Sequence, residues 1–104
     1  MSDPYGVCNT LQDPKAMTAC IAAANAQDFC SKTFPSPVQQ AYCSNGANWG
    51  MLSYMLNQDR NPNKGMEDMK CEEMGKTLPP DKAVFVQPIT TGCHAFVSHS
   101  HFGK

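Results

Sequence analysis

The sequence predicts a mainly α-helical domain with a small C-terminal β-hairpin, an α+β fold that is compact and disulfide-stapled. Apolar residues recur at helical spacing over much of the chain before Pro80, and β-branched and aromatic residues gather after it. The chain of 104 residues also contains an even number of cysteines, six. This length suits a single domain spanning residues 1–104, because two halves would be too small for separate cores.

The cysteines are spread along nearly the whole chain without a Cys-x-x-Cys pair: Cys8, Cys20, Cys30, Cys43, Cys71 and Cys93. Zinc knuckles and thioredoxin-like redox sites are built on such close pairs, so the spacing favours a disulfide framework. Spacing alone does not select the pairing. The alternative is a cytosolic chain whose reduced cysteines pack as small apolar side chains.

A disulfide framework implies an oxidising compartment, so we expect a secreted, extracellular protein. Residues 1–5 lack the basic start and apolar stretch of a signal peptide. The hypothesis of export therefore includes a signal peptide that has been removed and a Met1 that was added for expression.

The first predicted helix begins at Asp13-Pro14, where Asp13 serves as the cap and Pro14 occupies the first helical position. One apolar stripe then runs to about residue 30 through Met17, Cys20, Ile21 and Ala24. We expect the helix to bury this stripe.

Ser36-Pro37 is a second helix start, with Gln39 placed to complete a capping box. We expect this helix to stop or kink near Ser44-Asn45-Gly46, because these residues favour turns. A further helical stretch carries Trp49, Leu52, Met55 and Leu56 on one side. Trp49 is the predicted centre of the core, since a large ring can bury the most apolar area.

Residues 57–65 have no apolar periodicity and predict an exposed loop. Residues 66–76 predict a short helix, with acidic residues in its first turn and Lys76 near its end, as the helix dipole favours. After Pro80, residues 83–86 predict a strand, Thr90-Thr91-Gly92 a turn and residues 93–97 a returning strand.

The charges are nearly balanced, with 8 Lys and Arg against 9 Asp and Glu. Residues 64–76 interleave both signs and predict a solvated mixed-charge face. Nucleic-acid binding needs a concentrated basic footprint, so we expect no nucleic-acid partner. No apolar run approaches the ~20 residues that cross a bilayer, and membrane binding is not expected.

The candidate metal ligands are histidines, all of which lie in the last eleven residues: His94, His99 and His101. In an extended strand His99 and His101 project from the same face and could bind Cu(II), Ni(II) or Zn(II). The alternative is a polar C-terminal tail without a metal. No other cofactor is predicted.

Catalysis would require one of these histidines to pair with an acidic residue, and the candidates are Asp28, Glu67, Glu72 and Glu73. Nothing in the spacing selects a pair, and no complete catalytic motif is present. Met66, Met69, Cys71 and Met74 would spread over more than half of a helix circumference, which favours packing over a Cu(I) site.

The leading hypothesis is a binding or effector protein that recognises a protein or a cell-surface target through its surface. In general character the chain is similar to the small cysteine-rich proteins that fungi and other microbes secrete as effectors, toxins or antimicrobials. One alternative is a small secreted hydrolase or nuclease that uses the C-terminal histidines, and another is a metal-binding protein.

Overall fold

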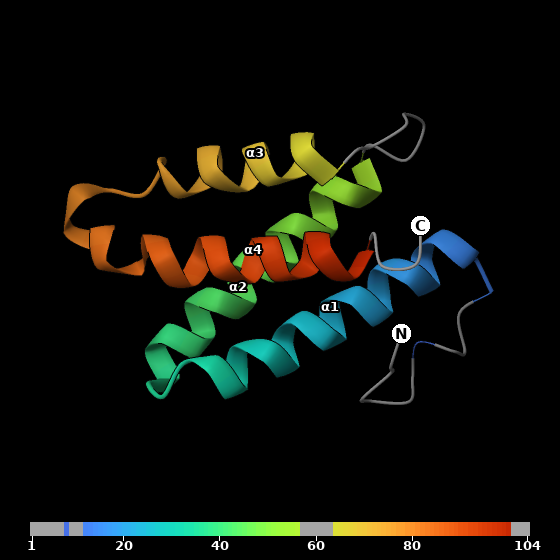
Figure 1. Cartoon of the computed structure of the whole chain (residues 1–104), viewed down its shortest axis with the longest axis horizontal. Coiled ribbons are helices and arrows are strands. Elements are labelled where there is room, and N and C mark those ends of the chain that lie inside the picture. The colour runs from blue at the N-terminus through green and yellow to red at the C-terminus, as the bar shows by residue number, and fades with distance from the viewer. Residues whose placement is uncertain (1–7, 9–11, 57–63, 101–104) are drawn as a thin grey trace.

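The computed structural model describes residues 8, 12–56 and 64–100, which form a helical body (Figure 1). The helices in this part of the chain are α1 (Pro14–Thr33), α2 (Pro37–Leu56), α3 (Lys64–Gly75), the 3-10 helix η2 (Pro80–Phe85) and α4 (Val86–Ser100). α1 and α2 form one helical hairpin. α3 and α4 form a second, joined through η2.

The last helix, α4, is the centre of the arrangement, because it packs against α1, α2 and α3. In Figure 1 α3 lies alongside α4, and α2 crosses behind α4 at a steep angle. The two hairpins therefore meet mainly where α2 crosses α4.

The predicted helix starts are confirmed. Asp13 caps α1, because its carboxylate accepts a hydrogen bond from the Lys15 backbone N–H at 3.3 Å. Pro37 is the first residue of α2. α3 begins two residues before the predicted start at Met66 and ends at Gly75. Of the predicted loop, residues 57–63 lie outside the described residues.

The predicted break at Ser44-Asn45-Gly46 is wrong, because α2 runs without interruption from Pro37 to Leu56. Gly46 is instead a packing residue. A Cβ atom at Gly46 would lie 1.8 Å from the Ile89 carbonyl oxygen, and one at Gly92 would lie 1.7 Å from the Cys43 carbonyl oxygen. Glycine at both positions lets the backbones of α2 and α4 approach closely.

The predicted C-terminal β-hairpin is also wrong, because the described residues contain helices and no strand. Residues 83–86 lie in η2 and the first turn of α4, and residues 93–97 lie inside α4. Pro88 is tolerated because it falls in the first helical turn, where no N–H partner is required. The Thr90 hydroxyl donates to the Val86 carbonyl at 2.8 Å, so this β-branched residue fits the helix as well.

Phe96 occupies the centre of the core and is 0 % exposed. Its ring packs against the Tyr54 ring in a T-shaped arrangement, with a centroid distance of 5.8 Å. The other buried members of this cluster are the small residues Ala19, Ala22, Ala23, Ala26 and Ala47. Trp49, the predicted centre, is 36 % exposed, because α2 buries a neighbouring face that carries Gly46, Gly50 and Tyr54.

All six cysteines are paired in sequence order, as Cys8–Cys20, Cys30–Cys43 and Cys71–Cys93. The second disulfide joins α1 to α2, and the third joins α3 to α4. None of them connects one hairpin to the other. Three intramolecular disulfides in a small chain are consistent with an extracellular protein.

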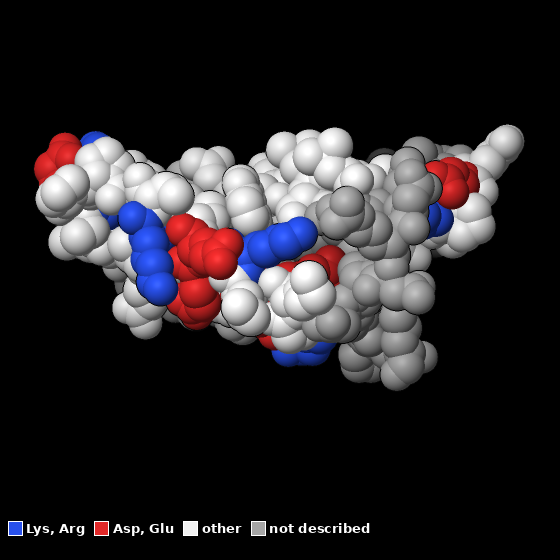
Figure 2. All heavy atoms as spheres, turned by 90° about the horizontal axis from the view of Figure 1, so that it is seen from above, with Lys and Arg blue, Asp and Glu red and all other residues white. Residues whose placement is uncertain are grey.

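The face that carries α3 mixes both signs of charge, as predicted. Figure 2 shows acidic side chains and lysines next to one another on this face. Lys64 Nζ, for example, lies 2.9 Å from Asp68 Oδ2. Glu67 departs from the prediction, since it is 8 % exposed and points inward.

Candidate functional site

An apolar hollow of about 440 Å³ lies between α1 and α2. Its described lining consists of Cys8, Ala16, Ala19, Cys20, Ala23, Ala24, Gln27, Asn48, Met51 and Met55. The alanines of α1 create the space, because their side chains are too short to fill the gap between the two helices. Met51 and Met55 form the opposite wall with flexible thioether side chains, which adapt easily to different shapes.

The hollow is elongated. Its α1 wall extends from Ala16 to Gln27. At a rise of 1.5 Å per residue, this segment of helix spans roughly 16 Å. The hollow can therefore hold an extended molecule along the helix axis.

An amide pair marks one end of the hollow, where the Gln27 Nε2 group donates to Asn48 Oδ1 at 3.2 Å. Because α1 and α2 are joined by the short turn before Pro37, this pair lies at the end nearest that turn. The described lining contains no charged side chain. The hollow thus combines apolar walls with one neutral polar end.

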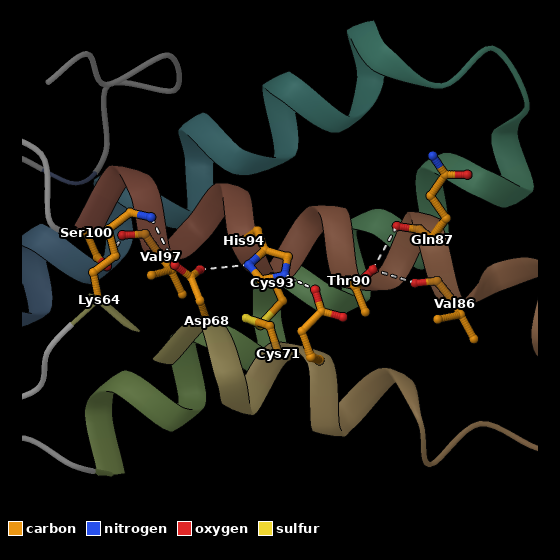
Figure 3. The surroundings of a disulfide bond; sticks show 11 residues. Lys64, Asp68, Cys71, Val86, Gln87, Thr90, Cys93, His94, Val97 and Ser100 are labelled. Atoms are coloured by element: carbon orange, nitrogen blue, oxygen red, sulfur yellow. Dashed lines mark hydrogen bonds and ion pairs between the residues drawn. A yellow bond between two sulfur atoms is a disulfide. The ribbon is translucent and has the colours of Figure 1, made fainter. Parts of the chain in front are cut away.

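A separate polar cluster is centred on His94, where α4 faces α3 (Figure 3). His94 Nδ1 lies 2.7 Å from Asp68 Oδ1, and His94 Nε2 lies 2.8 Å from Glu72 Oε1. Asp68 and Glu72 are four residues apart, so they share one face of α3. A carboxylate faces each ring nitrogen, so a protonated imidazole can donate a hydrogen bond to both Asp68 and Glu72.

The pKa values of the cluster follow from this geometry. Partial burial alone would lower the pKa of His94, but the hydrogen bonds and negative charges of Asp68 and Glu72 outweigh it and raise the pKa above 6.5. Partial burial would likewise raise the pKa of Asp68, but His94 and Lys64 outweigh it and lower the pKa below 3.8. The geometry therefore favours the charged forms of both His94 and Asp68.

The Cys71–Cys93 disulfide lies beside this cluster (Figure 3). Ligand atoms of Asp68, Cys71 and His94 all lie within 4.8 Å of one another. A sulfur atom bound in a disulfide cannot act as a thiolate ligand, so the oxidised cluster lacks the soft ligand that its spacing would otherwise offer.

The metal site predicted at His99 and His101 stays a prediction, although the strand that both residues were expected to share is not formed. His99 lies in α4, which ends at Ser100, and His101 lies outside the described residues. His94 pairs instead with Glu72, one of the acidic candidates, and with Asp68, which the sequence reasoning missed. The four-residue spacing of Asp68 and Glu72 within a predicted helix was the available signal.

The arrangement around His94 does not resemble the general base that the hydrolase alternative would require. A general base needs a ring nitrogen that can reach a substrate proton, and carboxylates hold both nitrogens of His94. His94 and His99 do line a hollow of about 360 Å³ together with Thr91 and Ser98. Within the described residues, neither hydroxyl is hydrogen-bonded to an imidazole.

Among the described helices, none has the length and apolar character that crossing a membrane would require. Comparisons with protein-family models, with curated proteins and with solved structures find nothing that matches this chain.

Proposed function

We propose that the protein is a secreted binding protein that holds an elongated apolar molecule with an uncharged polar end in the hollow between α1 and α2. The observation that carries this proposal is the hollow itself. Its volume of about 440 Å³ falls within the range of ligand pockets, and apolar walls with a few polar groups are typical of such pockets.

The chemistry of the lining defines the ligand class. Alanine and methionine walls favour a hydrocarbon chain, whose burial is driven by the removal of apolar surface from water. Gln27 and Asn48 are amides that can both donate and accept hydrogen bonds, so they suit an alcohol or an amide. A carboxylate would lose its hydration without gaining a cationic partner from the described lining.

The disulfides support the rest of the proposal. Cys8–Cys20 forms part of the wall of the hollow, and Cys30–Cys43 ties together the two helices that enclose it. A pocket held by cross-links loses less conformational entropy when it binds a ligand. Disulfides also persist in the extracellular space, where a secreted effector would meet its target.

The direct test is displacement of an environment-sensitive apolar fluorophore from the oxidised protein by dodecanol, dodecanamide and dodecanoate. We expect the alcohol and the amide to displace the fluorophore, and the carboxylate to be at least about tenfold weaker, since an unpaired charge is costly to bury. Failure of all three compounds to displace the fluorophore, or equal displacement by all three, contradicts the proposal.

Variants locate the binding site. Ala16→Leu and Ala23→Leu fill the hollow and should weaken dodecanol binding at least about tenfold, while the matched control Ala41→Leu lies on the exposed side of α2 and should bind normally. Gln27→Lys introduces a cation at the polar end and should shift the preference towards dodecanoate. Unchanged binding in both filled variants would place the ligand elsewhere.

A further inference from the structure

We propose that reduction of the Cys71–Cys93 disulfide by a dithiol creates a zinc site, in which one Zn²⁺ is bound by Cys71, Cys93, Asp68 and His94. This site is independent of the hollow between α1 and α2. It would make the seam between α3 and α4 hold either a disulfide or a metal ion, but never both.

The spacing of the ligands carries the proposal. Ligand atoms of Asp68, Cys71 and His94 lie within 4.8 Å of one another, and Cys93 is bonded to Cys71. Tetrahedral zinc binds sulfur, nitrogen and oxygen at about 2.0–2.3 Å, which places its ligand atoms roughly 3.3–3.8 Å apart. Only small side-chain movements are therefore needed to enclose the ion.

The two helices hold these ligands in the required places. Asp68 and Cys71 are three residues apart on one face of α3, and Cys93 and His94 are adjacent on α4. Figure 3 shows His94 and the disulfide side by side in the seam between these helices. The cysteines are fully buried, whereas the side chains of His94 and Asp68 are 34 % and 27 % exposed. The ion can therefore enter from the side of His94 and Asp68.

The neighbours of the ligands suit a metal as well. His94 Nδ1 faces Asp68, while Nε2 faces Glu72 at 2.8 Å. With zinc on Nδ1, the Nε2–H group can still donate to Glu72, which is the usual way in which a carboxylate orients a zinc-bound histidine. Lys64 Nζ, 2.9 Å from Asp68 Oδ2, offsets the net negative charge that two thiolates and a carboxylate leave around Zn²⁺.

The reaction balances with the dithiol as the reductant. Two electrons and two protons pass from the dithiol to the Cys71–Cys93 bond, which gives two thiols and an oxidised, disulfide-bonded reductant. Zinc then displaces both thiol protons and the proton on His94 Nδ1. Of the disulfides, Cys71–Cys93 is the one that lies in such a ligand cluster among the described residues.

The test uses the full chain, fully reduced and titrated with Co²⁺ as a spectroscopic substitute for Zn²⁺. We expect one equivalent to produce the intense visible bands of tetrahedral thiolate coordination, and Zn²⁺ to displace it. The bands should persist in the Cys30→Ser/Cys43→Ser variant and disappear in Cys71→Ser/Cys93→Ser. Bands that survive in the second variant, or that never form, overturn the proposal.

The other two ligands distinguish this site from metal bound to the thiols of an unfolded chain. His94→Gln and Asp68→Asn leave every thiol in place and should each weaken Co²⁺ binding at least about tenfold, whereas the matched control His99→Gln should not. Circular dichroism should show that Zn²⁺ maintains or restores helix in the reduced wild-type chain. Equal affinities in His94→Gln and His99→Gln, or no helix with zinc bound, overturn the proposal.

Discussion

His94 shows how the surroundings of a single residue determine its charge. The sequence placed His94 in a returning strand over residues 93–97, because it does not reveal which helices will face each other. In the folded protein, Asp68 and Glu72 reach the two ring nitrogens from α3. The identity of one partner could be guessed from the sequence, but the geometry of the cluster depends on how α3 and α4 pack.

The pKa shifts of this cluster predict how stability depends on pH. Since the pKa of His94 is raised above 6.5, its contribution is complete below that value and is lost as the pH rises through the folded-state pKa. Since the pKa of Asp68 is lowered below 3.8, its contribution is complete above that value and is lost as the pH falls through the folded-state pKa. The cluster therefore stabilises the fold most between these ordinary values.

His94→Gln should remove the part of this dependence that comes from His94, while Lys64 still acts on Asp68. We expect the difference in unfolding free energy between wild type and variant to be largest near about pH 5 and to shrink towards about pH 9. Because the His94 side chain is 34 % exposed and its partner Glu72 is 60 % exposed, water screens these ion pairs and the difference should stay below about 1 kcal/mol. Urea unfolding at several pH values measures it, with His99→Gln as the control. A difference that grows as the pH rises would contradict the prediction.

Phe96 and Trp49 test which aromatic residue anchors the core. Phe96→Ala should cost about 3–5 kcal/mol of unfolding free energy, because it leaves a cavity among small alanine side chains that cannot fill it. Trp49→Ala should cost about 1 kcal/mol or less, since the ring is partly in water. Denaturant unfolding of the two variants measures both losses. A larger loss in Trp49→Ala than in Phe96→Ala would contradict the prediction and would identify Trp49 as the anchor of the core.

At the scale of elements, the sequence predicted helix starts well and helix continuity poorly. Asp13-Pro14 and Ser36-Pro37 act locally, so their chemistry is visible in the chain itself. Gly46 and Gly92 resemble turn residues, but their role depends on a partner helix far away in the sequence. Glycine signals a turn or a close backbone approach, and only the packing of α2 on α4 shows which one applies.

The strands predicted over residues 83–86 and 93–97 were wrong for a similar reason. β-branched residues lower helix propensity by only about 0.7 kcal/mol or less per residue, which tertiary packing easily outweighs. The helical spacing of Ile89, Cys93, Phe96 and Val97 was present in the sequence, and these residues now face the helices around α4. The helical spacing was not recognised, because Thr90-Thr91-Gly92 within it is typical of a turn.

The glycines at the crossing give a prediction at this scale. Gly92→Ala should destabilise the protein by about 2–3 kcal/mol or more, because its Cβ would collide with the Cys43 carbonyl oxygen of the facing backbone. Gly50→Ala is the milder comparison, since its Cβ would meet Phe96 side-chain atoms at 3.2 and 3.4 Å, which requires a shift of a few tenths of an ångström rather than a collision with backbone. Thermal unfolding compares the two variants. A Gly92→Ala variant as stable as the wild type would contradict the prediction, because it would show that the backbones of α2 and α4 are further apart than a 1.7 Å contact requires.

For the whole molecule, the sequence predicted the existence of a disulfide framework but not its connectivity. The hollow between α1 and α2 was also invisible, because it arises where the alanine face of one helix lies opposite the methionine face of another. Composition indicates which side chains are small, and only the alignment of two helices shows where their shortness leaves space.

Because the cysteines pair in sequence order, each disulfide closes its own loop, and the three loops follow one another along the chain without overlapping. Cleavage of any one peptide bond between Cys43 and Cys71 would yield two polypeptides without a covalent link, because every disulfide closes within one of them. Such a nicked protein should run as one species under native conditions and as two in urea without reductant. A nick between Cys71 and Cys93 should leave a single species in urea until a thiol is added.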